Sequence, residues 1–161
     1  MTTDNEILCP SAFPEWEGAR LFAVVGGTCD RPETAYLDQS QPVAPKWLDL
    51  AGPVSPIEIF RFAAPCATHA CQQYDVDGGT CRLAQKTIRL APIVVHKLPR
   101  CTIRANCRWW VQEGAAACQR CPQVATLNFA PSEAMRIAAN PQITSLSADD
   151  QVANNADEQP A

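Results

Sequence analysis

No apolar run in this sequence is long enough to cross a membrane, and runs such as residues 21–25 are only a few residues long. Residues 1–20 also lack the basic start and the apolar stretch of a secretory signal peptide. These absences predict a protein without membrane contact, and we expect it in the cytoplasm. Thiols stay reduced in that compartment.

The motifs of several enzyme classes are missing as well. The sequence has no glycine-rich dinucleotide or P-loop motif, no nucleophile elbow, no H-E-x-x-H and no C-x3-C-x2-C of radical enzymes. The glycine-rich segment 76–81 does not follow a buried strand, so we interpret it as a ligand loop. No acid–base pair accompanies the cysteines. The sequence therefore favours an electron carrier or accessory protein over an enzyme.

Cysteine, by contrast, is abundant. Nine cysteines occur among 161 residues, and seven of them lie between residues 66 and 121. In a cytoplasmic chain this abundance favours metal binding over disulfides, and the odd count agrees. A secreted disulfide protein stays open as an alternative, because removal of a signal peptide would leave the same sequence.

The seven cysteines form two local groups, within residues 66–81 and 101–121. Each group offers four soft or borderline ligands within about twenty residues, and closing short loops costs little entropy. Such ligand sets suit zinc or iron–sulfur clusters and do not suit magnesium or calcium. The candidate metal ligands are Cys66, His69, Cys71 and Cys81 in the first group, and Cys101, Cys107, Cys118 and Cys121 in the second.

The role of His69 stays open between a metal ligand and a hydrogen-bonded neighbour of the ligands. Without it, the first group takes a fourth ligand from Cys9, Cys29 or a partner, or leaves one iron open. Cys9 stands apart in the sequence, and we expect its replacement by alanine to change little. His96 lies in an apolar, strand-like segment and is expected to be structural.

Ligand spacing separates two kinds of metal site. Zinc ribbons usually present two C-x2-C pairs, and here only Cys118 and Cys121 have that spacing. The other gaps are irregular and favour an iron–sulfur cubane, which is wider than one zinc ion. The segment 118–122, CQRCP, resembles the end of the bacterial ferredoxin motif. The resemblance implies a small iron–sulfur protein with one or two 4Fe–4S clusters. A zinc-stabilised module that binds protein or nucleic acid is the alternative.

Positive charge is concentrated in the same part of the chain. Residues 61–121 have a net charge of +6, although the whole protein has a net charge of −4. Basic side chains beside the second group either offset the charge of a thiolate-bound cluster or form ordinary solvated surface. The overall acidity argues against nucleic acid, so we expect a redox or biosynthetic partner protein. The arginines expected at the cluster are Arg100, Arg104, Arg108 and Arg120.

The segment between Cys107 and Cys118 has to bend. In one continuous helix these two cysteines would share a face but lie about 16 Å apart, which is too far for one metal site. We therefore expect Gly114 to end a helix as a left-handed cap, with Asn106 as the N-cap. The alanine-rich segment after it is then a ligand loop. The two tryptophans after Cys107 are expected to pack in the core, and contact with a partner is the alternative.

The rest of the sequence predicts a small, irregular α+β protein, with short helices and a few short strands around the ligand loops. We expect strands at 19–27 and 34–38 and helices at 55–64 and 132–140. For 87–98 we expect one or two short strands, or an extended crossing between the two cysteine groups. The expected regions are an N-terminal arm (1–19), a β-containing lobe (20–60), a cysteine-rich metal-binding core (61–140) and a disordered acidic tail (141–161).

Overall fold

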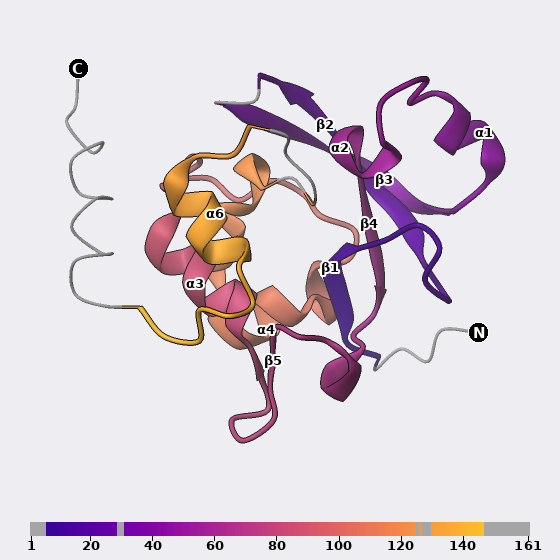
Figure 1. Ribbon diagram of the computed structural model, residues 1–161. Coiled ribbons are helices and arrows are strands. Elements are labelled where there is room, and N and C mark those ends of the chain that lie inside the picture. The colour runs from indigo at the N-terminus through magenta and orange to yellow at the C-terminus, as the bar shows by residue number, and fades with distance from the viewer. Residues whose placement is uncertain (1–5, 29–30, 125, 127–129, 147–161) are drawn as a thin grey trace, which may run out of the picture.

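The computed structural model describes residues 6–28, 31–124, 126 and 130–146. Its elements are β1 (Leu8–Ala12), β2 (Arg20–Gly27), β3 (Pro32–Pro42), α1 (Pro45–Asp49), α2 (Pro56–Ile59), β4 (Phe60–Pro65), η1 (Thr68–Ala70), β5 (Tyr74–Asp75), β6 (Thr80–Cys81), α3 (Arg82–Leu90), η2 (Arg104–Asn106), α4 (Arg108–Glu113), α5 (Ala115–Cys118), η3 (Cys121–Gln123) and α6 (Glu133–Ala139). The mixture of short helices and antiparallel strands confirms the predicted α+β class. Figure 1 shows the main sheet on one side, helices α3, α4 and α6 on the other, and the β5 hairpin projecting from the body.

The main sheet is antiparallel and has the strand order β1-β4-β2-β3. β2 and β3 confirm the two predicted strands, and Ala23 lies opposite Tyr36 in their ladder. β1 comes from the predicted N-terminal arm and pairs with β4, at the start of the predicted core. The sheet thus joins segments from three of the expected regions.

The helix predicted over 55–64 is wrong beyond its first turn. α2 begins after Ser55, whose backbone N–H donates to Glu58 Oε2 at 3.1 Å, as the capping-box pattern predicts. The chain then becomes strand β4 at Phe60. β4 is a central strand whose two faces are both buried, so its sequence is a continuous apolar run. Such a run has no period that distinguishes a strand from a helix.

The sheet separates two hydrophobic clusters. Because successive strand residues point to opposite faces, Phe62 joins one cluster and Ala63 the other. The cluster on the first face is formed by Ala12, Leu21, Ala51, Phe60, Phe62 and Ala64. The cluster on the second face is formed by Phe22, Ala23, Ala63, Ala84, Ile103, Cys107, Trp109, Ala117 and Val124. The cysteine-bearing segments therefore pack on the second face of the sheet.

The short strands predicted within 87–98 are wrong, and the alternative of an extended crossing fails for residues 87–90, which belong to a helix. Residues 82–90 form α3, and the chain from 91 to 100 is irregular. The buried residues Ala84, Thr87 and Leu90 recur every three residues, a helical period that the β-branched residues of the segment obscured. The helix predicted at 132–140 is confirmed as α6, where Ser132 Oγ accepts from the backbone N–H of Met135 at 3.2 Å.

Among the described residues, no helix combines the length and the apolar character needed to cross a bilayer. Two features of the sequence lie outside the described residues. These are Cys29 and most of the expected tail, from residue 147 onward.

We expect Gly27→Ala to destabilise the fold by about 3 kcal/mol. Gly27 ends β2 with a φ of +75°, and a Cβ there would lie 2.4 Å from the carbonyl oxygen of Arg31. Gly52→Ala is the matched control, because Gly52 has a φ of +60° but no atom within 4 Å of an added Cβ. Gly52→Ala should destabilise the fold only by the strain of an alanine at positive φ, about 1 kcal/mol. Urea unfolding measures both losses, and equal values would contradict the clash at Gly27.

Candidate metal centre

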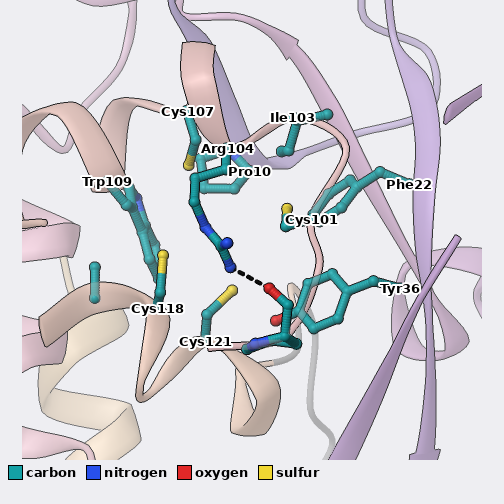
Figure 2. A pocket seen from close by; sticks show the side chains of 12 residues that line it. Pro10, Phe22, Tyr36, Cys101, Ile103, Arg104, Cys107, Trp109, Cys118 and Cys121 are labelled. Carbon is teal, nitrogen blue, oxygen red and sulfur yellow. Dashed lines mark hydrogen bonds between the residues drawn. The ribbon is translucent and has the colours of Figure 1, made fainter. Parts of the chain in front are cut away.

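The four cysteines of the second group lie around one cavity. Cys101 precedes η2, Cys107 is the N-cap of α4, Cys118 is the last residue of α5, and Cys121 begins η3. Figure 2 shows their thiols around the side chain of Arg104. Four short elements, each only one or two turns long, therefore bring the four thiols of this group together.

Gly114 separates α4 from α5, as the distance between Cys107 and Cys118 predicts. Its φ of 66° and ψ of −144° lie outside the left-handed helical region, in a region essentially restricted to glycine. Two details differ from prediction. The N-cap of α4 is Cys107 and not Asn106, and the alanine-rich segment forms a further helical turn before it returns to the site.

The walls of the cavity are largely apolar. The sheet contributes Pro10, Phe22 and Tyr36, Ile103 lies beside Phe22, and Trp109 covers the side opposite Phe22 and Tyr36. Trp109 is only 2% exposed and belongs to the core, as predicted. The cavity has a volume of about 20 Å³, which suits about one water molecule.

Arg104 occupies the middle of the second group (Figure 2). Its Nη2 donates to the carbonyl oxygen of Pro99. Burial raises the pKa of the Cys118 thiol, and the nearby Arg104 opposes this shift. The guanidinium lies over the ring of Trp110, 5.6 Å from the ring centre. Arg100, in contrast, is exposed. Of these two arginines, the structure brings only Arg104 to the thiols.

The other two predicted arginines have different surroundings. Arg120 donates through Nε to the carbonyl oxygen of Ala91 and through Nη1 to that of Ala116, both at 2.8 Å. It thus ties the chain after α3 to α5. Arg108 lies over the ring of Tyr74, 6.0 Å from its centre, on the side of the first group.

Sequence analysis missed Arg61, which lies on β4 and is completely buried. Its Nη1 donates to the Sγ and the carbonyl oxygen of Cys121, both at 2.9 Å, and its Nη2 donates to the carbonyl oxygen of Pro10 at 3.2 Å. In the described part of the chain, no carboxylate forms an ion pair with Arg61. The available signal was a single charged residue inside the apolar run FRFAA.

Tyr36 is a second missed neighbour of Cys121. Its side chain lines the same cavity as Cys121, and burial together with the nearby Cys121 raises the pKa of Tyr36. Burial by itself lowers the pKa of Arg61, but the charges of Cys121 and Tyr36 outweigh it and raise the pKa above its ordinary value. Cys121 thus receives a hydrogen bond from Arg61 on β4, and Tyr36 on β3 lines the same cavity.

Burial also raises the pKa of three thiols in the second group, those of Cys101, Cys107 and Cys118. For Cys107 it raises the pKa to about 12, although the backbone N–H groups of Trp109 and Trp110 oppose the shift. These thiols are therefore protonated at neutral pH, and a metal that binds them must release their protons.

The first group gains a cysteine from a distant part of the sequence. Burial raises the pKa of Cys9 to about 12, and the neighbouring Cys81, Cys66 and Cys71 add to this shift. Cys9 is thus close enough to the other three for their charges to act on it. It does not stand apart, as its position in the sequence led us to expect.

Strand pairing explains how Cys9 reaches the first group. Cys9 on β1 lies opposite Ala64 on β4. The backbone N–H of Cys66 donates to the carbonyl oxygen of Ile7, the residue before β1, at 2.9 Å. His69 is exposed on η1, and its ring centre lies 5.3 Å from that of Tyr74. Strand pairing therefore brings Cys9 close to Cys66, and the His69 ring lies tilted against Tyr74 at an interplanar angle of 56°.

Helix α4 connects the two groups. It begins at Cys107 of the second group, and its Gln112 holds the backbone of Cys81 in the first. Gln112 Oε1 accepts from the N–H of Cys81 at 2.7 Å, and Gln112 Nε2 donates to the carbonyl oxygen of Cys81 at 3.0 Å. On the sheet side, Leu8, which precedes Cys9, forms an isolated parallel β-bridge with the backbone of Cys107. The two groups are neighbours that share β1 and α4.

All eight described cysteines are free thiols. Within the described ranges, no three His, Cys, Asp or Glu side chains are placed to hold one metal ion. No family model, curated protein or solved structure matches this chain. The two groups of thiols and their surroundings are therefore the basis for any inference about function.

Several buried N–H groups near the cysteines have no acceptor in the described part of the chain. Trp109 Nε1 and Arg104 Nε belong to side chains that line the cavity, and Arg61 Nε belongs to the neighbour of Cys121. Arg108 Nε, near Tyr74, is unpaired as well. A buried donor without an acceptor costs about 1–3 kcal/mol. Such donors point to a group that accepts hydrogen bonds when it binds.

Proposed function

We propose that this chain is an iron–sulfur protein that holds one or two 4Fe–4S clusters on its two groups of four cysteines. It acts in electron transfer to a partner enzyme, or as an accessory subunit of one. The observation that carries the proposal is the second group, in which four thiols surround one apolar-walled cavity lined by buried donors. The reduced thiols agree with a cytoplasmic location.

Charge supports metal-bound thiolates in the second group. A buried guanidinium is costly unless an anion lies beside it, and Arg61 has the Sγ of Cys121 at 2.9 Å. Metal binding removes the proton from a cysteine thiol. A metal-bound Cys121 would therefore supply the negative charge that Arg61 lacks in a free thiol.

The unpaired donors favour a cluster over a single zinc ion. A zinc ion held by four thiolates brings no acceptor of its own, whereas the inorganic sulfides of a cluster accept hydrogen bonds from N–H groups. Trp109 Nε1 and Arg104 Nε are donors of this kind. The apolar walls would also keep water away from a cluster.

Cluster binding requires Arg104 to move. Its side chain fills the space between the thiols, and the cavity of about 20 Å³ beside it is too small for a cluster. Arg104 lies in the short helix η2 and is attached by a long, flexible side chain. We expect its guanidinium to withdraw to the edge of the site, where it would still offset the charge of the cluster.

The first group offers a second site of the same kind. Its four thiols belong to Cys9, Cys66, Cys71 and Cys81, and all four residues are half-buried. The neighbouring residues His69, Ala70 and Gln72 are exposed. The first group thus lies near the surface, as do Cys101, Cys118 and Cys121 of the second, which suits electron exchange with a partner protein.

Purification without oxygen, followed by analysis of iron, zinc and acid-labile sulfide, tests the proposal. We expect about four irons and four sulfides for each occupied group, and a broad visible absorption band at about 400 nm. Cys118→Ala should lower both contents, because it removes one ligand of the second group. A colourless protein with about two zinc ions and no sulfide would overturn the proposal in favour of a zinc-stabilised binding module.

A further inference from the structure

A polar cleft of about 330 Å³ lies beside α3, and none of the described cysteines lines it. Its walls come from α3, from the last residue of α4 and from the chain that follows α6. Figure 1 shows α3 and α6 side by side, in agreement with their contacts. A volume of this size suits a small ligand. The polar side chains that line this α3 cleft are Gln85, Lys86, Arg89, Glu113, Thr144 and Ser145.

Lys86 is the buried cation of the α3 cleft. The residue is only 3% exposed, and its Nζ donates to the carbonyl oxygens of Asn140 at 2.7 Å and Ile143 at 2.9 Å. These two bonds hold the turn that leads into the wall formed by Thr144 and Ser145. An ammonium group has three N–H bonds, so one remains for a ligand.

The charge of Lys86 has no acid to balance it. In the described part of the chain, no carboxylate lies within ion-pair distance of its ammonium group. Burial lowers the pKa of Lys86, nearby Cys81 opposes this shift, and Arg82 adds to it. A buried charge is costly unless an opposite charge lies beside it. Arg89 lies one helical turn further along α3, so the cleft contains a buried cation and an exposed one.

We propose that the α3 cleft binds a small polar ligand through an oxyanion group, either a phosphate or a carboxylate. The oxyanion accepts from the Lys86 ammonium group and from the Arg89 guanidinium, which form charge-assisted hydrogen bonds with such groups. The hydroxyl groups of Thr144 and Ser145 suit a ligand that also carries hydroxyl groups. Binding does not require a metal at the cysteines, because none of the described cysteines lines the cleft.

Glu113 is the acid of the α3 cleft. It is the last residue of α4, and its Oε1 accepts from Gln112 Nε2 at 2.8 Å. Its charge opposes an anion, but the two cations of the cleft exceed it. A bare inorganic ion offers no hydrogen to this carboxylate, whereas a hydroxyl group does. The cleft therefore suits an oxyanion that carries hydroxyl groups over a bare ion.

Titration of the full chain with three probes of one three-carbon skeleton tests the proposal. Glycerol 3-phosphate and glycerate carry the two oxyanions, and glycerol carries neither. Amide NMR spectra in a phosphate-free, reducing buffer measure the dissociation constants. We expect at least one oxyanion probe to bind with a Kd of about 1 mM or below and to shift the signals of residues 85–89 and 144–146. Glycerol should not bind at about 20 mM. The tighter probe identifies phosphate or carboxylate.

Substitutions in the cleft should change the Kd of that probe in both directions. Lys86→Gln should weaken binding about tenfold or more, because it removes a buried charged donor. Arg89→Gln should weaken it about threefold, since this arginine is exposed. Glu113→Gln should tighten it about twofold or more, because the amide removes a like charge and keeps an oxygen for Gln112.

The matched control is Arg136→Gln, which removes an exposed arginine of α6 that pairs with Glu133 at 3.3 Å and does not line the cleft. It should leave the Kd unchanged. If Lys86→Gln does not fold, Arg89→Gln and Glu113→Gln decide, because their effects are opposite in sign.

Three results overturn the proposal: neither oxyanion probe binds, glycerol binds as tightly as they do, or Arg89→Gln weakens binding no more than Arg136→Gln. The last result would indicate general attraction of anions to basic surface. None of these measurements depends on iron or sulfide, so failure here and failure of the proposed iron–sulfur function are distinguishable.

Discussion

Cys9→Ala is expected to remove about half of the iron and sulfide of a protein that carries two clusters, because it deletes one of four thiolate ligands. Cys9 on β1 lies opposite Ala64 on β4 and close to Cys66, and burial together with Cys81, Cys66 and Cys71 raises the pKa of its thiol. His69→Ala should retain the full content, since the His69 ring lies against Tyr74 and is exposed. Iron and sulfide per folded chain measure both effects.

The pair of variants separates two ligand sets for the first group. Loss of metal in His69→Ala together with a normal content in Cys9→Ala would support the set predicted from sequence alone, with His69 as the fourth ligand. The visible band of the second group serves as an internal control, because its four cysteines are unchanged in both variants. It should persist in each of them.

Trp109→Ala is expected to lower the free energy of unfolding by about 4 kcal/mol. Trp109 is 2% exposed, and its ring packs against the core on the cysteine-bearing face of the sheet while lining the cavity. Its removal leaves a large void and admits water to the site. Urea unfolding under reducing, oxygen-free conditions measures the loss, and a value below about 1 kcal/mol would contradict the core role of this ring.

Two further variants serve as controls for Trp109→Ala. Trp109→Phe keeps an apolar ring and removes the unpaired Nε1 donor, so we expect a loss of only about 1–2 kcal/mol. Trp47→Ala removes a partly exposed ring that packs on the opposite face of the sheet. It should destabilise the protein less than Trp109→Ala and leave the iron content unchanged.

Elements specified by neighbouring residues could be predicted. Strand β2 is an apolar run that ends at two glycines, and helix α6 starts after its N-cap Ser132 and ends before Pro141. The break at Gly114 followed from the length of a helix alone. In each case the signal lies within a few residues of the element it specifies.

Elements decided by distant packing could not be predicted. β4 has the same continuous apolar pattern as a buried helix, and only its place between β1 and β2 makes it a strand. The amphipathic period of α3 was obscured by its β-branched residues, and contacts with other helices determine which face is buried. Local propensity is weak compared with such packing.

For the candidate site, the sequence by itself determined the second group, because its four cysteines lie within a short segment and short loops close at little entropic cost. It also determined that positive charge accompanies the cysteines. Only the tertiary structure decided that Cys9 lies close to Cys66, that Arg61 contacts Cys121, and that Tyr36 lines the cavity of the second group. The physical reason is strand pairing: the order β1-β4-β2-β3 brings these three residues to the cysteine segments, although Arg61 is 60 residues from Cys121 in the chain.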